Sequence, residues 1–480
     1  MDATRSSSPW LLPRFWNTLS KETQPLETTE PGVVRMYHCG PTVYQRPTIG
    51  NWRSFLLADL LRRLLEWGGW DVVQVMNITD VGHFRENEGG DKMAHEADAL
   101  GESPWEVAER VTTWFLEDMD RLRMKRPHHL PRATDYIPSM VELVERLLKS
   151  GHAYEVEEQV YFSVSAFKEY GVLSGNKVED LIAGARVEVD ERKRHPADFA
   201  LWKTDPHHVM KWETTLGKDG FPGWHLECSA MALSLLGETL DIHTGGEDLV
   251  FPHHECEIAQ SEAATGKLYC RHWLHNRFLM VDGGKMGKSL GNAYTPEDVI
   301  RKGYTSRELR FALLRGHYRQ PLNFTWEGME DARGFLSRLD RFQEEIVRLA
   351  ETEDKGRGIV FPIRTAFIEA LENDLDVPAA LTVLMDGIRT WRATSLGGEG
   401  AREVLSFLGE VDDVLGIGPE LQEEDREIDR LVSKRERARK RGDWTEADRI
   451  REILKSQGIE VEDTPHGPQW RSDSGGGSPR

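Results

Sequence analysis

The feature that most constrains the fold of this chain is a strand–loop–helix–strand pattern in residues 33–77. Residues 33–39 and residues 72–76 are short, mainly apolar runs that predict strands. Between them, two glycines at 68–69 end a predicted helix whose apolar positions recur at helical spacing, namely Leu57, Leu60, Leu61, Leu64 and Leu65. Two strands joined by a helix pair in a parallel sheet, so this unit predicts an α/β fold.

The loop between the first strand and the helix has the features of a phosphate-binding turn. Gly40, Pro41, Pro47 and Gly50 lie in it. The free N–H groups and the positive dipole end of the following helix attract anions. Loops of this kind serve many functions, so the pattern favours nucleotide binding without fixing it.

The length of 480 residues predicts more than one domain, because a single hydrophobic core stops growing near about 250–300 residues. A charged and mostly helical stretch at about 100–200 is expected as an insertion, and strand patterns return at 240–243 and 278–281. From Trp326 onward, helical periodicity predicts a second, all-helical domain, with the apolar series Met329, Ala332, Leu336, Leu339, Phe342, Ile346 and Leu349. The expected parts are an N-terminal segment at 1–32, the α/β domain at 33–325, the helical domain at 326–419, a basic module at 424–472 and a disordered tail at 473–480.

Composition predicts a cytoplasmic protein. Hydrophobic residues make up 39% and charged residues 30% of the chain, and no apolar run approaches the roughly 18–20 residues of a membrane span. Pro13 and Arg14 end the N-terminal apolar stretch too early for a signal peptide. The 4 cysteines are too few for a disulfide framework, and we expect them to be reduced.

Charge argues against broad, nonspecific nucleic-acid binding, since the net charge is −20. Residues 434–441 nevertheless combine four arginines and two lysines with a single acidic residue. This run is either the solvated face of a helix or a local phosphate contact, and the sequence leaves both interpretations open.

A possible metal site is scattered along the chain. Cys39 and Cys228 lie beside Gly, Trp and His residues rather than in plain core runs, and His253 and Glu257 share one face of an expected helix. Two thiolates, an imidazole and a carboxylate are all normal zinc ligands. Capping and packing remain the alternative, because no closely spaced cysteine pair is present. His254 and Glu255 are expected to point elsewhere, whereas Cys256 competes as a possible ligand.

Longer segments resemble the cysteinyl-tRNA synthetases, a class I aminoacyl-tRNA synthetase family, over about residues 14–472. Segments 39–44, 222–231 and 251–257 are similar to the family's zinc-ligand segments, and 241–249 resembles its Gly-rich nucleotide strand end. Segment 285–289 matches the class I lysine loop, and segments 77–80 and 197–203 are also family-like.

Three departures from the family pattern occur. Thr48 replaces the first histidine of the class I signature, so that the motif reads Thr48, Ile49, Gly50 and Asn51. Gly287 stands where the lysine loop usually has serine, and Cys256 lies where the family more often has asparagine. The first departure puts the reaction rate in question, because threonine cannot carry the charge of an imidazole.

The resemblance implies a class I Rossmann-like parallel sheet with a connective insertion, then an all-helical anticodon-binding domain and a small C-terminal module. It implies a cysteine–tRNA ligase that forms cysteinyl-adenylate from ATP and transfers cysteine to the 3′-terminal adenosine of tRNA(Cys). One Zn²⁺ per subunit would select the cysteine thiolate against serine, because shape alone separates such similar molecules weakly. Mg²⁺ would accompany ATP.

The resemblance also assigns roles to residues of this sequence. The implied catalytic residues are Thr48, Asn51, Lys285 and Lys288; the implied ATP-binding residues are Ile49, Gly50, Gly245, Gly246, Asp248 and again Lys288. The implied substrate-binding residues are Gly40, Thr79 and Trp224, and the implied metal ligands are Cys39, Cys228, His253 and Glu257. Solvated surface for the lysines and core packing for Trp224 are the structural alternatives.

The expected partners are ATP, L-cysteine and tRNA(Cys), with no membrane and a monomeric chain. Two rival functions remain. A cysteine ligase that acts on an amino sugar, as in mycothiol synthesis, would share the zinc and ATP sites but should lack the anticodon-reading region. An inactive zinc-dependent RNA-binding paralogue is suggested by Thr48 and Gly287.

Overall fold

The computed structural model describes residues 11–82, 92–177, 191–287, 290–354, 360–394, 396–419 and parts of 428–472. The chain forms two compact units. The first comprises Met1–Leu336, Pro362–Asp386 and Asp412–Gly416, and the second comprises Ser337–Phe361, Gly387–Val411 and Ile417–Arg480. The domain limits expected from the sequence stay predictions.

The first unit is built on a parallel sheet, as the sequence predicts. Its strands are β3 (Val33–His38), β4 (Asp71–Met76), β10 (Leu240–Gly246) and β11 (Cys270–Asn276), in the order β11-β10-β3-β4. All three pairings are parallel. Strand β11 was not predicted from the sequence. The strand expected at 278–281 is present as β12 (Leu279–Val281), but it belongs to a separate small sheet.

Helix α1 (Ile49–Trp67) connects β3 to β4, and the five leucines of the predicted stripe are all buried. It ends before Gly68, as predicted. At its N-terminus, the Thr48 N–H and hydroxyl both donate to Asn51 Oδ1 at 2.9 Å. This contact fixes the backbone where the phosphate-binding turn is expected.

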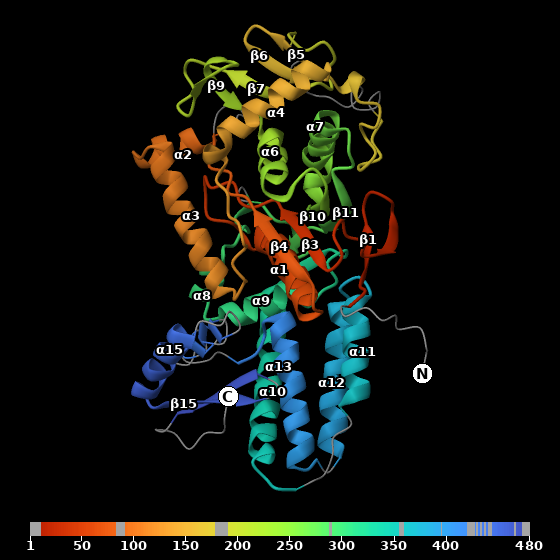
Figure 1. Cartoon of the computed structure of the whole chain (residues 1–480), viewed down its shortest axis with the longest axis vertical. Helices are drawn as coiled ribbons and strands as arrows, with labels where there is room; N and C mark the ends of the chain where they lie inside the picture. The colour runs from red at the N-terminus through yellow and green to blue at the C-terminus, as the bar shows by residue number, and fades with distance from the viewer. Residues whose placement is uncertain are drawn as a thin grey trace. The chain divides into compact units, whose positions relative to one another are not determined.

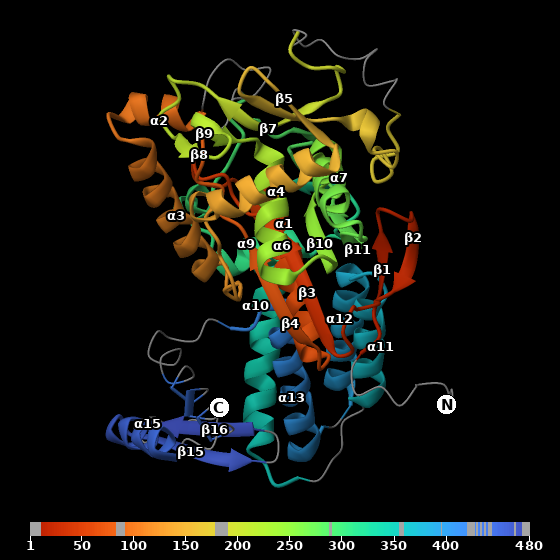
Figure 2. The same cartoon turned by 45° about the horizontal axis from the view of Figure 1, so that its top comes forward.

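Helices cover both faces of the central sheet. The ring of His38 meets Phe55 of α1 in a T-shaped contact, whereas Tyr37 and Cys39 join a core that includes Leu226 of α6 (Trp224–Leu236). Successive strand residues point to opposite faces, so α1 and α6 lie on opposite sides. Figures 1 and 2 show α6 and α7 (Glu255–Thr265) between the central sheet and the sheet of the insertion.

The insertion begins with helices and continues with a sheet. Its helices are α2 (Lys92–Leu100), α3 (Pro104–Arg121) and α4 (Ile137–Ser150). A five-stranded sheet in the order β5-β6-β7-β9-β8 follows, formed by Ala153–Val156, Gln159–Phe162, Phe199–Thr204, Gly217–Pro222 and Trp212–Thr214. Within the stretch of about 100–200 that was expected to be mostly helical, α3 and α4 are helices, whereas β5 and β6 are strands that were not predicted. Strands this short leave little regular alternation to detect.

The helices α10 (Trp326–Ala350), α11 (Phe361–Glu372), α12 (Val377–Ala393) and α13 (Gly398–Leu415) confirm the predicted helical region. Within the second unit, the ring of Trp391 stacks on Phe342 and meets Phe407 edge-on. Its C-terminal part contains α15 (Trp444–Ser456) and the hairpin of β15 (Ile459–Thr464) and β16 (Gly467–Ser472), around a core that includes Ile450 and Trp470.

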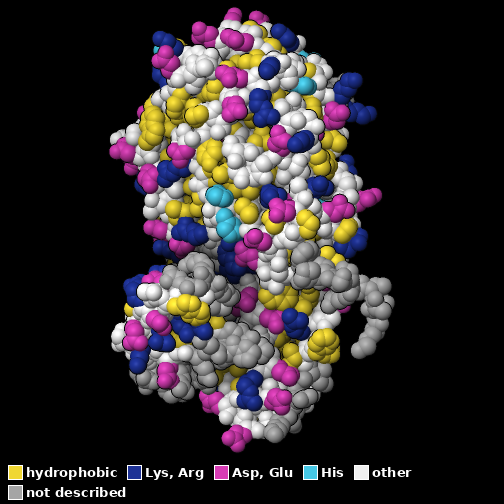
Figure 3. Space-filling model, in the orientation of Figure 1, with side chains coloured by type: hydrophobic (Ala, Val, Ile, Leu, Met, Phe, Trp, Pro, Cys, Tyr) yellow, Lys and Arg dark blue, Asp and Glu magenta, His cyan; other side chains and the backbone are white. Residues whose placement is uncertain are grey.

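In the described part of the chain, none of the helices combines the length and apolar character needed to cross a membrane. The face drawn in Figure 3 carries acidic and basic side chains interspersed rather than one broad basic surface. In the basic run, Lys434 forms an ion pair with Glu446 at 3.0 Å, so this lysine already has an acidic partner.

Candidate metal and active site

The structure brings the four predicted metal ligands together. Cys39 follows β3, and Cys228 lies in α6. His253 lies in a short helix at Val250–His254 that directly precedes α7, and Glu257 lies in the first turn of α7. Their ligand atoms all lie within 4.8 Å of one another, and all four residues are buried. The two sulfurs are 3.8 Å apart. Two Zn–S bonds of about 2.3 Å at a tetrahedral angle require about this separation, so the donor set fits a tetrahedral metal site.

A second group of donors shares two of these residues. Cys39 and Glu257 also gather with His243 and His254. The Nε2 atom of His254 lies 3.3 Å from Cys39 Sγ, so the expectation that His254 points elsewhere is wrong. His254 lies at the cluster because a short kinked helix at Val250–His254 precedes α7 and brings both His253 and His254 to this place.

The neighbours of these histidines point away from the cluster. Glu255 accepts a hydrogen bond from the backbone N–H of Ser174 at 2.8 Å, so its carboxylate is engaged outside the cluster of candidate metal ligands. The Sγ atom of Cys256 lies 3.4 Å from the hydroxyl of Tyr170. Among the described residues, neither group of candidate ligands includes Cys256.

Buried charges define the electrostatics of the cluster. A hydrogen bond from Cys39 outweighs burial and lowers the pKa of Cys228. Burial alone would lower the pKa of His253, but its bonds to Cys228 and Glu257 raise that pKa to about 10. Glu257 has a lowered pKa despite burial, because His243 and His253 face it. Burial and the neighbouring Cys228, by contrast, raise the pKa of Cys39 well above its usual range. Cys228 and Glu257 are thus the donors shifted toward the negatively charged form, which suits binding of a divalent metal ion.

The two oxygens of Glu257 have different surroundings. Oε2 accepts a hydrogen bond from the Tyr269 hydroxyl at 3.0 Å and lies 3.0 Å from His243 Nε2. Oε1 faces the other donors, at 3.1 Å from His253 Nε2 and 3.7 Å from Cys39 Sγ. One oxygen is thus anchored, and only the other is turned toward the candidate ligands.

A second histidine layer surrounds the donors, and the sequence reading did not identify it. His225 Nδ1 lies 2.9 Å from His253 Nδ1, which turns the Nε2 atom of His253 toward the cluster. His254 Nδ1 lies 2.8 Å from His275 Nε2, and His275 Nδ1 lies 2.8 Å from the Thr18 hydroxyl. Hydrogen-bond partners of this kind orient the rings of metal-binding histidines. His225 lies in segment 222–231, next to Trp224, and this position is the signal by which it could have been found.

The predicted substrate-binding residues border this cluster. Trp224 is 37% exposed, and its ring centroid lies 4.5 Å from that of His253. Gly40 passes so close to Asn77 that a Cβ atom would meet its carbonyl oxygen at 1.8 Å. Thr79 is buried and pairs with the 41–43 backbone, since its N–H donates to Pro41 O and its carbonyl accepts from Val43 N–H, both at 3.0 Å.

The two predicted phosphate-binding segments lie side by side. A Cβ atom on Gly50 would lie 2.5 Å from the Cε atom of Met286, so the lysine loop contacts the N-terminus of α1. Lys285 is exposed, and Asn292 holds its loop by donating to Lys285 O and accepting from Gly287 N. Lys288 lies outside the described residues.

Not every predicted nucleotide residue is free for ligands. Ile49 is fully buried, and its N–H already donates to Tyr294 O at 2.9 Å. Gly245 is the last residue but one of β10 and lies beside His254, because a Cβ atom on it would meet His254 Cε1 at 2.7 Å. A Cβ atom on Gly246 would meet Asp248 Oδ1 at 2.5 Å, so these two residues lie together.

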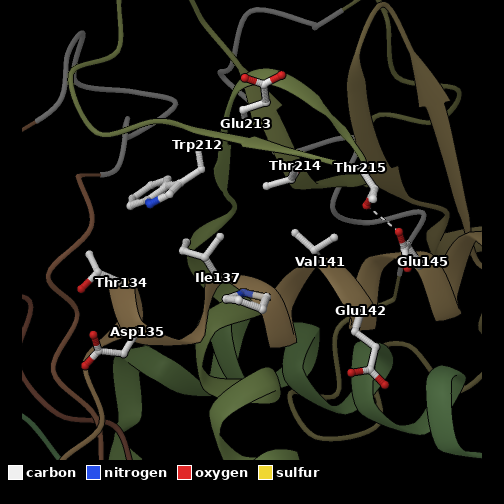
Figure 4. A pocket seen from close by; sticks show the side chains of 11 residues that line it. Thr134, Asp135, Ile137, Val141, Glu142, Glu145, Trp212, Glu213, Thr214 and Thr215 are labelled. Atoms are coloured by element: carbon white, nitrogen blue, oxygen red, sulfur yellow. Dashed lines mark hydrogen bonds between the residues drawn. The ribbon is translucent and has the colours of Figure 1, made fainter.

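A cavity of about 640 Å³ lies elsewhere in the first unit, between α4 and β8 (Figure 4). Ile137, Val141 and Trp212 supply apolar lining, and Glu142 and Glu145 supply acidic lining. None of the predicted site residues lines it, so it is separate from the metal cluster.

Comparison with known proteins places this geometry in a family. The family model "tRNA synthetases class I (C) catalytic domain" matches residues 25–334, and "Cysteinyl-tRNA ligase anticodon binding domain" matches residues 421–471. A cysteine–tRNA ligase of Thermus thermophilus is 44% identical, over 95% of this chain and 98% of its own. One of Salinibacter ruber is 41% identical over the same shares.

Solved structures agree on the fold. Mycobacterium tuberculosis methionyl-tRNA synthetase, in complex with methionyl-adenylate, matches with a TM-score of 0.60 and 16% identity, over 80% of this chain and 89% of that chain. This likeness supports the class I synthetase fold. The family matches and the relatives of 41% and 44% identity show that the chain belongs to the cysteine–tRNA ligase family of class I tRNA synthetases.

Proposed function

We propose that this protein activates L-cysteine with ATP and joins it to the 3′-terminal adenosine of tRNA(Cys). The buried cluster of Cys39, Cys228, His253 and Glu257 within a class I synthetase fold carries the proposal. A soft metal ion held by these donors, two of which are sulfur atoms, would bind the sulfur of a thiol substrate directly.

The proposed reaction has two steps. The carboxylate of cysteine attacks the α-phosphate of ATP and releases pyrophosphate, and a terminal ribose hydroxyl of the tRNA then attacks the carbonyl carbon and releases AMP. Both steps need positioning and charge neutralisation more than covalent participation by the protein.

The nucleotide site would form at the N-terminus of α1. Since the Ile49 N–H is already bonded to Tyr294, the remaining N–H groups of the first turn and the helix dipole would meet the phosphates. Thr48 and Asn51 hold this turn. Lys285 and Lys288 would neutralise the charge that develops on pyrophosphate, with Mg²⁺ entering as part of the ATP substrate. Gly245, Gly246 and Asp248 would receive adenosine.

The amino-acid site would lie at the metal cluster. Zinc held by the four donors would supply a soft Lewis acid that prefers a thiolate to a serine hydroxyl. Trp224 lies over His253 and would wall the pocket, whereas Gly40 allows the chain to pass beside Asn77. Glu257, anchored through Oε2, would offer a single oxygen and leave room for the substrate sulfur.

The second unit would bind the anticodon arm of the tRNA. The match of residues 421–471 to an anticodon-binding model supports this role and disfavours the amino-sugar ligase, which has no use for such a module. One chain supplies all four candidate ligands, so we propose a monomer as the working unit. We also propose a cytoplasmic location, where ATP, cysteine and tRNA are all available.

Product analysis tests this function against its rivals. The protein is incubated with ATP and labelled cysteine, with either tRNA(Cys) or a glucosamine-containing acceptor. We expect label on tRNA(Cys) and none on the amino sugar. Label on the sugar alone would establish the ligase of amino sugars. Binding of tRNA(Cys) without any AMP formation would establish the inactive paralogue.

A further inference from the structure

A line of hydrogen bonds connects Gly40 to Glu227 beside the candidate metal cluster. The Gly40 N–H donates to Asn77 Oδ1 at 2.9 Å, and Asn77 Nδ2 donates to Thr79 Oγ1 at 3.0 Å. The Thr79 hydroxyl then donates to Glu227 Oε2 at 2.9 Å. All three donors point in one direction, toward the carboxylate. We call Gly40, Asn77, Thr79 and Glu227 the acceptor relay.

The relay decides what Thr79 can offer a ligand. A hydroxyl group has one hydrogen and two lone pairs. In Thr79 the hydrogen is directed to Glu227, and one lone pair accepts from Asn77. One lone pair remains, so Thr79 can accept a further hydrogen bond but cannot donate one. It therefore suits an ammonium group and does not suit a carboxylate.

The relay is placed to act on an amino acid bound through its sulfur. Gly40 directly follows Cys39, and Glu227 directly precedes Cys228. Asn77, Thr79 and Glu227 are no more than 3% exposed, which strengthens hydrogen bonds among them. The α-nitrogen of cysteine is only three bonds from its sulfur, so a thiolate at the cluster keeps its nitrogen near this wall.

Resting on the proposed function, we infer that Glu227 is a positioning residue that sets Thr79 as the hydrogen-bond acceptor for the α-ammonium group of cysteine. The pocket thereby favours a free α-amino thiol. An N-acylated cysteine offers only a neutral amide N–H, and a thiol without nitrogen offers no donor. Hydrogen bonds that involve a charged partner are about twice as strong as neutral ones, which gives the relay its selectivity.

Equilibrium binding of three thiols to the zinc-replete protein tests this inference. Cysteine has both the ammonium and the carboxylate, cysteamine has the ammonium alone, and 3-mercaptopropionate has the carboxylate alone. In Glu227→Gln the side chain is neutral and can turn its NH₂ toward Thr79. We expect the affinity for cysteine and cysteamine to fall about 10- to 100-fold. The affinity for 3-mercaptopropionate should change by less than about 2-fold.

Two results would overturn the inference: an equal loss for all three thiols, or unchanged binding of cysteine. Asp80→Asn is the matched control, because Asp80 is a buried carboxylate next to Thr79 that instead accepts from the N–H and hydroxyl of Thr134, at 2.9 and 2.7 Å. If Asp80→Asn also lost affinity for cysteine and cysteamine but not for 3-mercaptopropionate, a general effect of buried negative charge would explain the result, and the acceptor relay would not be needed.

Variants of Thr79 keep the test independent of how well Glu227→Gln folds. Thr79→Val should lose affinity for cysteine and cysteamine, and Thr79→Ser should retain it, because only serine keeps the hydroxyl. Zinc content is measured in each variant, so loss of the metal is distinguished from loss of the acceptor. Failure of the wild-type protein to bind cysteine at all would instead remove the proposed function.

Discussion

Glu257 illustrates how a single residue can be tuned by neighbours that do not touch a ligand. Tyr269 and His243 hold its Oε2 atom, and this leaves Oε1 turned toward His253 and Cys39. A carboxylate fixed in this way binds a metal through one oxygen without having to be ordered first. Outer partners of this kind contribute about 10- to 100-fold to metal affinity.

Tyr269→Phe should therefore weaken zinc binding by about 10-fold, because Glu257 loses the hydroxyl that fixes its orientation. Competition with a chromogenic chelator measures the zinc dissociation constant. Tyr170→Phe is the control, since the Tyr170 hydroxyl contacts Cys256 rather than a candidate ligand. Equal zinc affinities in wild type and Tyr269→Phe would show that Glu257 needs no such anchor.

Ligand chemistry is what made the metal donors recognisable from the sequence. Cys39, Cys228, His253 and Glu257 belong to residue types that bind zinc, and their segments resemble those of one family. Tyr269 and His225 carried no such signal, because a hydrogen bond behind a ligand imposes no spacing on the sequence. Their roles depend on contacts between distant segments, which only the folded chain displays.

At the scale of elements, a buried ion pair joins α1 to α9 (Ser306–Leu314). Arg310 donates to Asp59 Oδ2 at 2.6 Å, and both side chains are fully buried. Arg63 donates to the same oxygen at 2.8 Å. Burial alone would raise the pKa of Asp59, but the positive charges of Arg310 and Arg63 lower this pKa below its usual value. The helix that begins at the phosphate turn is thus fixed to its neighbour.

Asp59→Asn should destabilise the protein by about 3–5 kcal/mol near neutral pH, because it leaves Arg310 buried without its counter-charge. Since the folded pKa of Asp59 is lowered, the contribution of the carboxylate is complete above the unfolded pKa of about 3.9 and is lost as the pH falls through the folded value. The difference in unfolding free energy between wild type and variant, measured by urea denaturation, should therefore narrow below about pH 4.

The exposed pair of Arg35 and Glu30 provides the comparison. The Arg35–Glu30 distance of 2.7 Å is close to that of the buried pair, but the two side chains are 29% and 55% exposed. Glu30→Gln should change stability by less than about 1 kcal/mol. Similar losses in Glu30→Gln and Asp59→Asn would mean that burial adds nothing to the ion pair.

The elements with strong periodicity were predictable, and those without it were not. The leucine stripe of α1 and the apolar series of α10 gave clear helical signals. Strand β11 was missed because arginine and histidines interrupt its apolar residues without a regular alternation, although both histidines are buried in the folded chain. The short strands of the insertion sheet were missed because tertiary pairing, not local pattern, defines them.

At the scale of the whole molecule, adenylate formation and tRNA recognition are assigned to different parts of the chain. Removal of residues 424–480 should spare cysteine-dependent pyrophosphate exchange, because no predicted ligand or nucleotide residue lies there. It should reduce charging of tRNA(Cys) by at least about 10-fold through loss of anticodon-arm contacts. Steady-state charging as a function of tRNA concentration measures this, and equal charging by the truncated protein would contradict the assignment.

The central claim is that the metal cluster selects cysteine for activation by ATP. Its most direct test is exchange of labelled pyrophosphate into ATP, with cysteine and serine in parallel, for zinc-replete and chelator-treated protein. The account predicts exchange with cysteine only, lost on chelation and restored by added zinc. Equal exchange with serine, or exchange that survives complete removal of the metal, would contradict it.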